Sequence, residues 1–119
     1  MSARRLLAAF AALAVLVGIG ASSVLARSQM GTPKVKVTAL DTLKFTLSTK
    51  KAHHGKVSFV VTNKGSLKHD FWIAGKKTAL LGHNKTVTLT VTIKKGKNAY
   101  KCTVPGHAAA GMKGTFIGT

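Results

Sequence analysis

Apolar and polar residues alternate with a period of two along most of the chain after residue 33. In residues 86–93 the alternation is strict, with valine, leucine or isoleucine at every second position and threonine between them. This period gives a β-strand one apolar and one polar face. Clusters of glycine, asparagine and lysine interrupt the pattern and mark turns. The alternation predicts short strands at residues 34–40, 43–48, 57–63, 68–74, 86–93, 97–102 and 113–117.

No segment after Ala26 combines helical periodicity with capping residues. Seven or eight short strands separated by turn signals predict an all-β fold, a sandwich or a Greek-key barrel. At 119 residues the chain has room for one domain with a modest core.

The N-terminal region follows another pattern. Arg4 and Arg5 precede an apolar run from Leu6 to Gly20, and Val24-Leu25-Ala26 has the small or apolar residues of a cleavage site. This order is typical of a secretory signal peptide. The alternative is an uncleaved membrane-anchor helix, because Leu6 to Ala26 is long enough to cross a bilayer.

We therefore predict a signal peptide at residues 1–26, a flexible leader at 27–33 and one domain at 34–119. Export places the domain in the periplasm or the extracellular space, free or anchored by the N-terminal segment. In such an oxidising compartment a lone cysteine is unusual, because exported cysteines tend to pair. Metal binding is one role that explains it.

Residues 100–112 carry the candidate chemistry. Cys102, the chain's one cysteine, is followed by His107 and then by Met112, with four residues in each gap. A thiolate, an imidazole and a thioether form a soft ligand set that suits copper better than magnesium or calcium. Taken singly, the cysteine and the methionine would be read as core residues. Their combination in one loop predicts a metal site.

A copper site of this kind needs a second histidine. His69 is favoured because it begins a strongly apolar segment directly after a turn, so that a sheet would hold its imidazole in place. The other candidates lie in hydrophilic turns, where we expect surface histidines: His53, His54 and His83.

Two stretches, NKGSLKHDF at 63–71 and YKCTVPGHAAAGMKG at 100–114, resemble the cupredoxins of the plastocyanin/azurin family. The loop spacing is most similar to the rusticyanin, sulfocyanin and auracyanin group. The resemblance covers residues 34–119 and implies an eight-stranded Greek-key β-sandwich. It also implies one type 1 (blue) copper ion and electron transfer as the activity. The ligands implied are His69, Cys102, His107 and, axially, Met112.

The chain departs from the family at Asp70, where asparagine is common after the first histidine. A carboxylate can accept hydrogen bonds from the cysteine loop but cannot donate them, so the surroundings of the ligands are altered. The ligand assignment itself is unaffected.

The function implied is an exported blue copper protein that shuttles single electrons between redox partners. A copper carrier or scavenger is the alternative from a different class. We expect no enzymatic activity, because the chain has only two carboxylates, Asp41 and Asp70, and we expect Asp41 to cap backbone groups in a turn. His107, in a loop of small residues, is the expected electron port.

The formal net charge is +17, from 19 Lys and Arg against 2 acidic residues. Nucleic acid is a poor candidate partner, because the chain is predicted to be exported and its lysines are spread over every turn and strand. We expect a monomer that docks on acidic redox proteins or on an anionic membrane surface. Adaptation to acid is an alternative reason for having so few carboxylates.

Overall fold

The computed structural model describes residues 31–119. The predicted signal peptide, its alternative as an anchor helix, and most of the leader lie outside these residues. None of the described residues forms a helix of the length and apolarity needed to cross a membrane.

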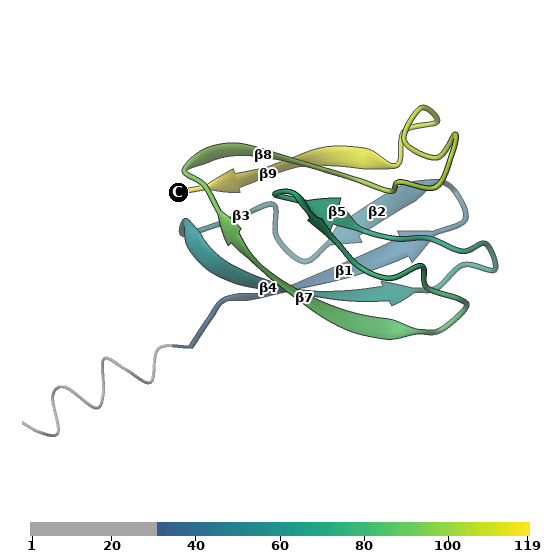
Figure 1. Cartoon of the computed structure of the whole chain (residues 1–119), viewed down its shortest axis with the longest axis horizontal. Helices are drawn as coiled ribbons and strands as arrows, with labels where there is room; N and C mark the ends of the chain where they lie inside the picture. Colours follow the sequence, from purple (N-terminus) through teal and green to yellow (C-terminus); the bar gives the residue numbers. More distant parts are fainter. Residues whose placement is uncertain (1–30) are drawn as a thin grey trace, which may run out of the picture. The chain divides into compact units, whose positions relative to one another are not determined.

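The described residues form nine strands in two sheets, as predicted for a β-sandwich (Figure 1). The four-stranded sheet has the order β2-β1-β4-β7, and the five-stranded sheet has the order β3-β9-β8-β5-β6. Three strands contain only two residues. The bounds are β1 Lys34–Leu40, β2 Lys44–Leu47, β3 Lys51–Ala52, β4 Gly55–Asn63, β5 Trp72–Ile73, β6 Lys76–Lys77, β7 Thr86–Ile93, β8 Gly96–Lys101 and β9 Lys113–Gly118.

The strand predicted at 68–74 is much shorter than expected, because only Trp72–Ile73 is extended within the sheet. His69 forms an isolated antiparallel bridge with Leu81, through backbone hydrogen bonds of 3.2 and 2.8 Å. Its side chain and that of Asp70 are both buried, whereas a regular strand turns neighbouring side chains to opposite faces. The departure from strand geometry is therefore located at a candidate ligand.

Two smaller differences concern turns. Leu43 was expected to begin a strand, but its φ of 57° places it in the turn between β1 and β2. The hydrophilic tip around residues 50–56 contains β3, which pairs in parallel with β9. A two-residue strand has no measurable alternation, so the sequence gives no sign of it.

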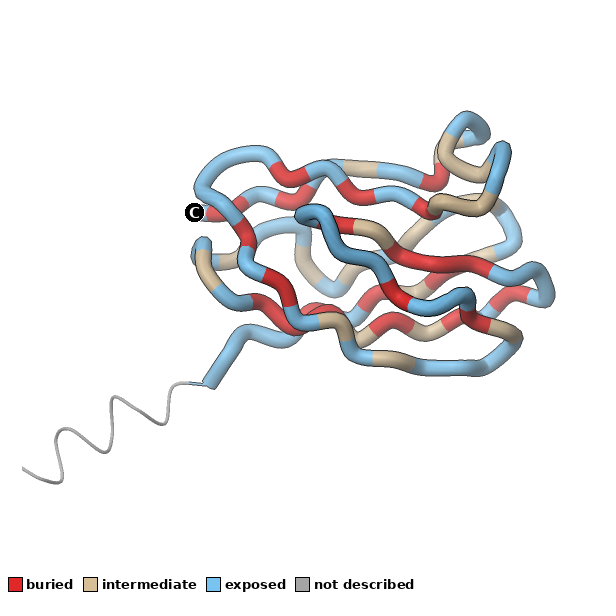
Figure 2. The backbone as a smooth tube through the Cα atoms, viewed as in Figure 1, coloured by how far each residue is buried: buried red, intermediate tan, exposed pale blue. Residues whose placement is uncertain are grey.

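Buried and exposed residues alternate along much of β1, β7, β8 and β9, as expected for strands with one face in the core (Figure 2). The central strand β4 is buried more continuously. Phe59 lies at the centre, with its ring 5.4 Å from that of Phe71 and 5.2 Å from that of Phe116. Burial of each such ring contributes roughly 1.5–3 kcal/mol. A second, smaller cluster contains Ala39, Cys102 and Met112, so the apolar core continues into the candidate metal site.

Candidate metal centre

The predicted ligands come from two loops at one end of the sandwich, the end away from the C-terminus (Figure 1). Cys102 directly follows β8 and Met112 directly precedes β9, with His107 in the loop between them. His69 lies in the segment that joins β4 to β5. The fold thus brings together residues more than thirty positions apart.

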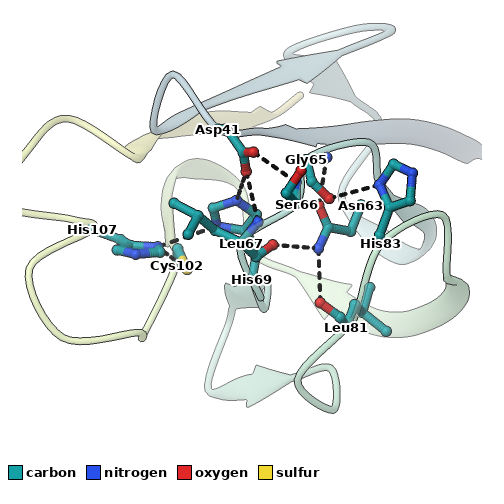
Figure 3. A network of polar contacts seen from close by, with 10 residues as sticks. All are labelled: Asp41, Asn63, Gly65, Ser66, Leu67, His69, Leu81, His83, Cys102 and His107. Carbon is teal, nitrogen blue, oxygen red and sulfur yellow. Dashed lines mark hydrogen bonds and ion pairs between the residues drawn. The ribbon is translucent and has the colours of Figure 1, made fainter.

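Three of the four side chains converge on one point (Figure 3). The Nδ1 atoms of His69 and His107 are 3.2 Å apart, and Sγ of Cys102 is 3.6 Å from Nδ1 of His107. The ligand atoms of all three lie within 4.8 Å of one another. Two imidazoles and one thiolate are the equatorial donors that copper takes in blue-copper sites, so this donor set fits the metal.

Met112 is fully buried and packs in the same apolar cluster as Cys102. The loop is closed by its own backbone, because Cys102 N–H donates to Met112 O and Met112 N–H donates to His107 O, both at 3.0 Å. Gly106 and Gly111 have φ values of 84° and 113°, which side-chain-bearing residues rarely adopt. Both glycines therefore lie at turns of the loop.

Burial raises the pKa of the Cys102 thiol, since an apolar environment disfavours the thiolate. A bound cation acts in the opposite direction and favours the deprotonated form. The apolar cluster around the Cys102 sulfur thus excludes water from the thiol. The thiolate, which is the form that binds a metal, is therefore favoured only when the metal ion is present.

Asp70 accepts hydrogen bonds from the loop, as expected for a carboxylate at this position. Its Oδ1 receives the backbone N–H of Thr103 at 2.6 Å, and its Oδ2 receives the Thr103 hydroxyl. Both bonds hold the residue that follows Cys102. The Asp70 carboxylate therefore fixes the start of the loop that carries the predicted ligands.

Asp41 lies in the turn after β1 and caps backbone groups, as predicted. Its carboxylate accepts the N–H groups of Ser66 at 2.6 Å and Leu67 at 3.0 Å, and the Ser66 bond is the main cause of its lowered pKa. Sequence reasoning missed its third contact, Oδ1 at 3.2 Å from Nε2 of His69. No local pattern could reveal it, because the two residues are 28 positions apart.

Asn63 supports the segment that carries His69. It is fully buried, its amide donates to the carbonyls of Leu67 and Leu81 at 2.8 Å each, and its Oδ1 accepts the N–H of Gly65 at 2.8 Å. These three bonds join Asn63, at the end of β4, to Gly65 and Leu67, which precede the His69–Leu81 bridge, and to Leu81 within it.

Asn63→Ala is expected to lower the free energy of unfolding of the metal-free protein by about 2–4 kcal/mol, because it removes three hydrogen bonds and leaves the N–H of buried Gly65 without its partner. Urea unfolding followed by circular dichroism measures this difference. Thr62→Ala is the control, since the Thr62 hydroxyl bonds Thr86 on the exposed face, and its loss should change stability by less than about 0.5 kcal/mol. Equal losses in the two variants would contradict the role assigned to Asn63.

The remaining histidines lie on the surface. His53 and His54 are exposed at the tip before β4, and Nδ1 of His54 is 2.6 Å from the carbonyl oxygen of Thr119. His83 is exposed, with Nδ1 2.9 Å from the carbonyl oxygen of Gly65. None of the three is in the cluster formed by His69, Cys102 and His107.

Residues 21–117 match a family of copper-binding proteins described as the plastocyanin/azurin family. A sequence comparison with curated proteins found no match. Several solved structures share the fold. An auracyanin from Roseiflexus castenholzii is 17% identical, with a TM-score of 0.64, over 75% of this chain and 99% of its own.

Auracyanin A from Chloroflexus aurantiacus is 19% identical, with a TM-score of 0.62, over 75% of this chain and 100% of its own. The azurin Az-iso2 from Methylomonas sp. strain J is 16% identical, with a TM-score of 0.60, over 75% of this chain and 99% of its own. The family match and the histidine–cysteine–histidine cluster both fit one type 1 copper ion as the cofactor. Since the family match spans most of its length, the chain belongs to the plastocyanin/azurin family of copper-binding proteins, the cupredoxins.

Proposed function

We propose that this protein is an exported blue copper protein that shuttles single electrons between redox partners. The observation that carries the proposal is the convergence of Nδ1 of His69, Nδ1 of His107 and Sγ of Cys102. These three groups would hold the metal, with the thioether of Met112 as a weaker fourth contact. When bound, copper supplies a one-electron couple between Cu(II) and Cu(I).

The protein's part is to keep these groups in one arrangement. Asp41 contacts the His69 ring, Asp70 holds the backbone after Cys102, and the loop bonds to itself across Met112. A donor set held in this way changes little when the charge at its centre changes by one, which favours fast electron exchange. Since both carboxylates of the chain are used in these contacts, we propose an electron carrier and no enzyme.

His107 is the proposed electron port. Its ring is half-buried, and the loop beside it exposes Ala109 and Ala110, whose small side chains let a partner come close. Two large apolar side chains are also exposed on the segments that carry and bridge His69: Leu67 is 50% and Leu80 is 54% accessible. These features support docking of a redox partner at this end of the sandwich.

The test is an anaerobic titration of the copper-loaded protein with a reductant of known strength. We expect one electron per copper ion to bleach the visible absorption, and one equivalent of oxidant to restore it fully. A stoichiometry other than one, or a spectrum that does not return, would argue against a reversible carrier of single electrons.

Lysines on the five-stranded sheet support an acidic partner. In the strand register Lys77 pairs with Trp72, Trp72 with Lys101, and Lys101 with Lys113. Directly paired residues share one face of a sheet, so these four side chains form a row across it. The Lys101 Nζ lies 5.2 Å from the centre of the Trp72 ring. Lys101 and Lys113 are sequence neighbours of Cys102 and Met112, so the row is adjacent to the proposed copper site.

Reversing the charges of Lys77 and Lys113 together, by Lys77→Glu and Lys113→Glu, is expected to slow reduction by ferrocyanide, an anionic probe, roughly tenfold at low salt. Stopped-flow kinetics at several ionic strengths measures the effect, which should shrink as salt screens it. The control reverses Lys36 and Lys56, exposed on the other sheet. Equal slowing in both double variants, or a wild-type rate that does not fall with salt, would contradict electrostatic docking at this row.

Export and domain boundaries are proposals from the sequence: a signal peptide at residues 1–26, a leader at 27–33 and the copper domain at 34–119. The start of β1 at Lys34 supports the last boundary. N-terminal sequencing of the protein recovered outside the cytoplasm should give Arg27 as its first residue. Recovery of the full-length chain in the membrane fraction would instead favour the anchor, close to an anionic membrane surface.

A further inference from the structure

Asp41 makes more contacts than capping a turn requires. The carboxylate spans two segments, because it accepts backbone N–H groups from Ser66 and Leu67 while Oδ1 lies 3.2 Å from Nε2 of His69. The imidazole is 1% accessible, whereas the Asp41 side chain is 40% accessible. Figure 3 shows the His69 ring between Asp41 on one side and the Cys102–His107 pair on the other.

This arrangement determines which nitrogen of His69 is available as a ligand. A carboxylate only accepts, so Nε2 must carry the hydrogen that it receives. In the neutral ring Nδ1 then keeps its lone pair, and Nδ1 is the atom that faces His107 at 3.2 Å. The opposite tautomer would place a lone pair against the carboxylate and a hydrogen toward the proposed metal position.

We propose that Asp41 is a positioning residue that fixes the tautomer and ring orientation of His69, strengthens its Nδ1 donor and so favours Cu(II) over Cu(I). A carboxylate bonded to a metal-bound histidine raises the basicity of that histidine as a ligand. The inference rests on the proposed function, since it assigns a role within the same copper site. It adds Asp41, a residue of the β1–β2 turn that contacts Nε2 of His69 and not Nδ1, the atom that would bind copper.

Gly65 provides the room that this contact needs. A Cβ atom at Gly65 would overlap Oδ1 and Cγ of Asp41, so any larger residue would displace the carboxylate. Gly65 is itself held in place by its hydrogen bond to Asn63. Gly65→Ala therefore removes the contact while keeping the charge, and Asp41→Asn removes the charge while keeping the size.

The first experiment uses the metal-free protein and is independent of electron transfer. In wild type at pH 8 we expect a downfield proton resonance from Nε2–H of His69 that exchanges slowly with water, because the ring is buried and bonded to a carboxylate. In Asp41→Asn it should move upfield or vanish. Asp70→Asn is the matched control, since Asp70 bonds Thr103 and should leave this resonance unchanged. An unchanged resonance in Asp41→Asn would overturn the proposal.

The second experiment measures the reduction potential of the copper-loaded variants. Loss of an outer partner typically weakens metal binding 10–100-fold. If Cu(II) binding falls about tenfold relative to Cu(I), the potential rises by about 59 mV for one electron. Both Asp41→Asn and Gly65→Ala should raise it. A higher potential in Asp41→Asn alone would show that the charge of Asp41 acts without the contact, and would contradict the role given to the contact. An unchanged potential in both variants would overturn the proposal. If wild type fails to cycle between oxidation states while the metal-free result holds, then only the proposed function fails.

Discussion

Cys102→Ser is expected to abolish the intense visible absorption of the copper-loaded protein. That absorption requires a copper–thiolate bond, and Cys102 is the chain's only cysteine. The cysteine is 1% accessible and its sulfur lies 3.6 Å from Nδ1 of His107, as expected for a buried ligand. Since the chain has no second cysteine, no other thiolate of the chain can replace it. A serine hydroxyl in the same apolar cluster is a harder and far less acidic ligand. Copper binding should weaken together with the loss of colour.

The measurement is an optical and EPR comparison of the two proteins at equal copper content. Circular dichroism of the metal-free forms provides the control, because the exchange of sulfur for oxygen should leave the β-sandwich folded. An intense visible band that persists in folded Cys102→Ser would overturn the assignment of Cys102 as a ligand.

His69→Ala has the second largest expected effect. The side chain contributes one of the three converging donors, and its loss leaves one imidazole and one thiolate. We expect copper affinity to fall by more than 100-fold, beyond the 10–100-fold range that is typical when an outer partner is lost. The backbone bridge between His69 and Leu81 does not involve the ring, so the strand arrangement should persist.

Competition with a chelator of known affinity measures the change. His53→Ala is the matched control, because His53 is exposed and outside the cluster, and it should bind copper as wild type does. Should the two variants bind copper equally, the second histidine ligand would have to be sought elsewhere.

The long strands could be predicted from alternation alone. The predicted bounds of 34–40 and 86–93 agree with β1 and β7, because each strand has one face in the core and one in solvent. The two-residue strands β3 and β6 are too short to show a period. The strand at 68–74 was overextended, because its apolar residues suggested a ladder that the buried His69 and Asp70 interrupt.

The candidate site was predictable to the extent that its residues are neighbours in the sequence. Cys102, His107 and Met112 share one loop, so their spacing is visible in the sequence. The contact of Asp41 with His69 and that of Asn63 with Leu81 were not predictable in this way, because they join segments that only the folded chain brings together. An aspartate in a turn and an asparagine at the start of a turn both have ordinary local explanations.

The two acidic residues of the chain both lie at the end of the domain that holds the candidate metal site. The chain has two acidic residues, and both carboxylates lie beside proposed ligands, Asp41 at His69 and Asp70 at the residue after Cys102. Acidic side chains are thus confined to the copper end, where each makes specific hydrogen bonds. The lysines therefore dominate the electrostatic field that an approaching partner experiences.

Copper retention through a redox cycle tests the central proposal most directly, because it separates an electron carrier from a copper carrier or scavenger. The copper-loaded protein would be reduced without oxygen, dialysed against a Cu(I) chelator of moderate affinity and then reoxidised, with copper measured at each stage. The buried, bonded ligand loop predicts that copper stays bound throughout and that the visible band returns in full. Release of copper on reduction, with no colour after reoxidation, would contradict electron transfer and favour delivery of the metal.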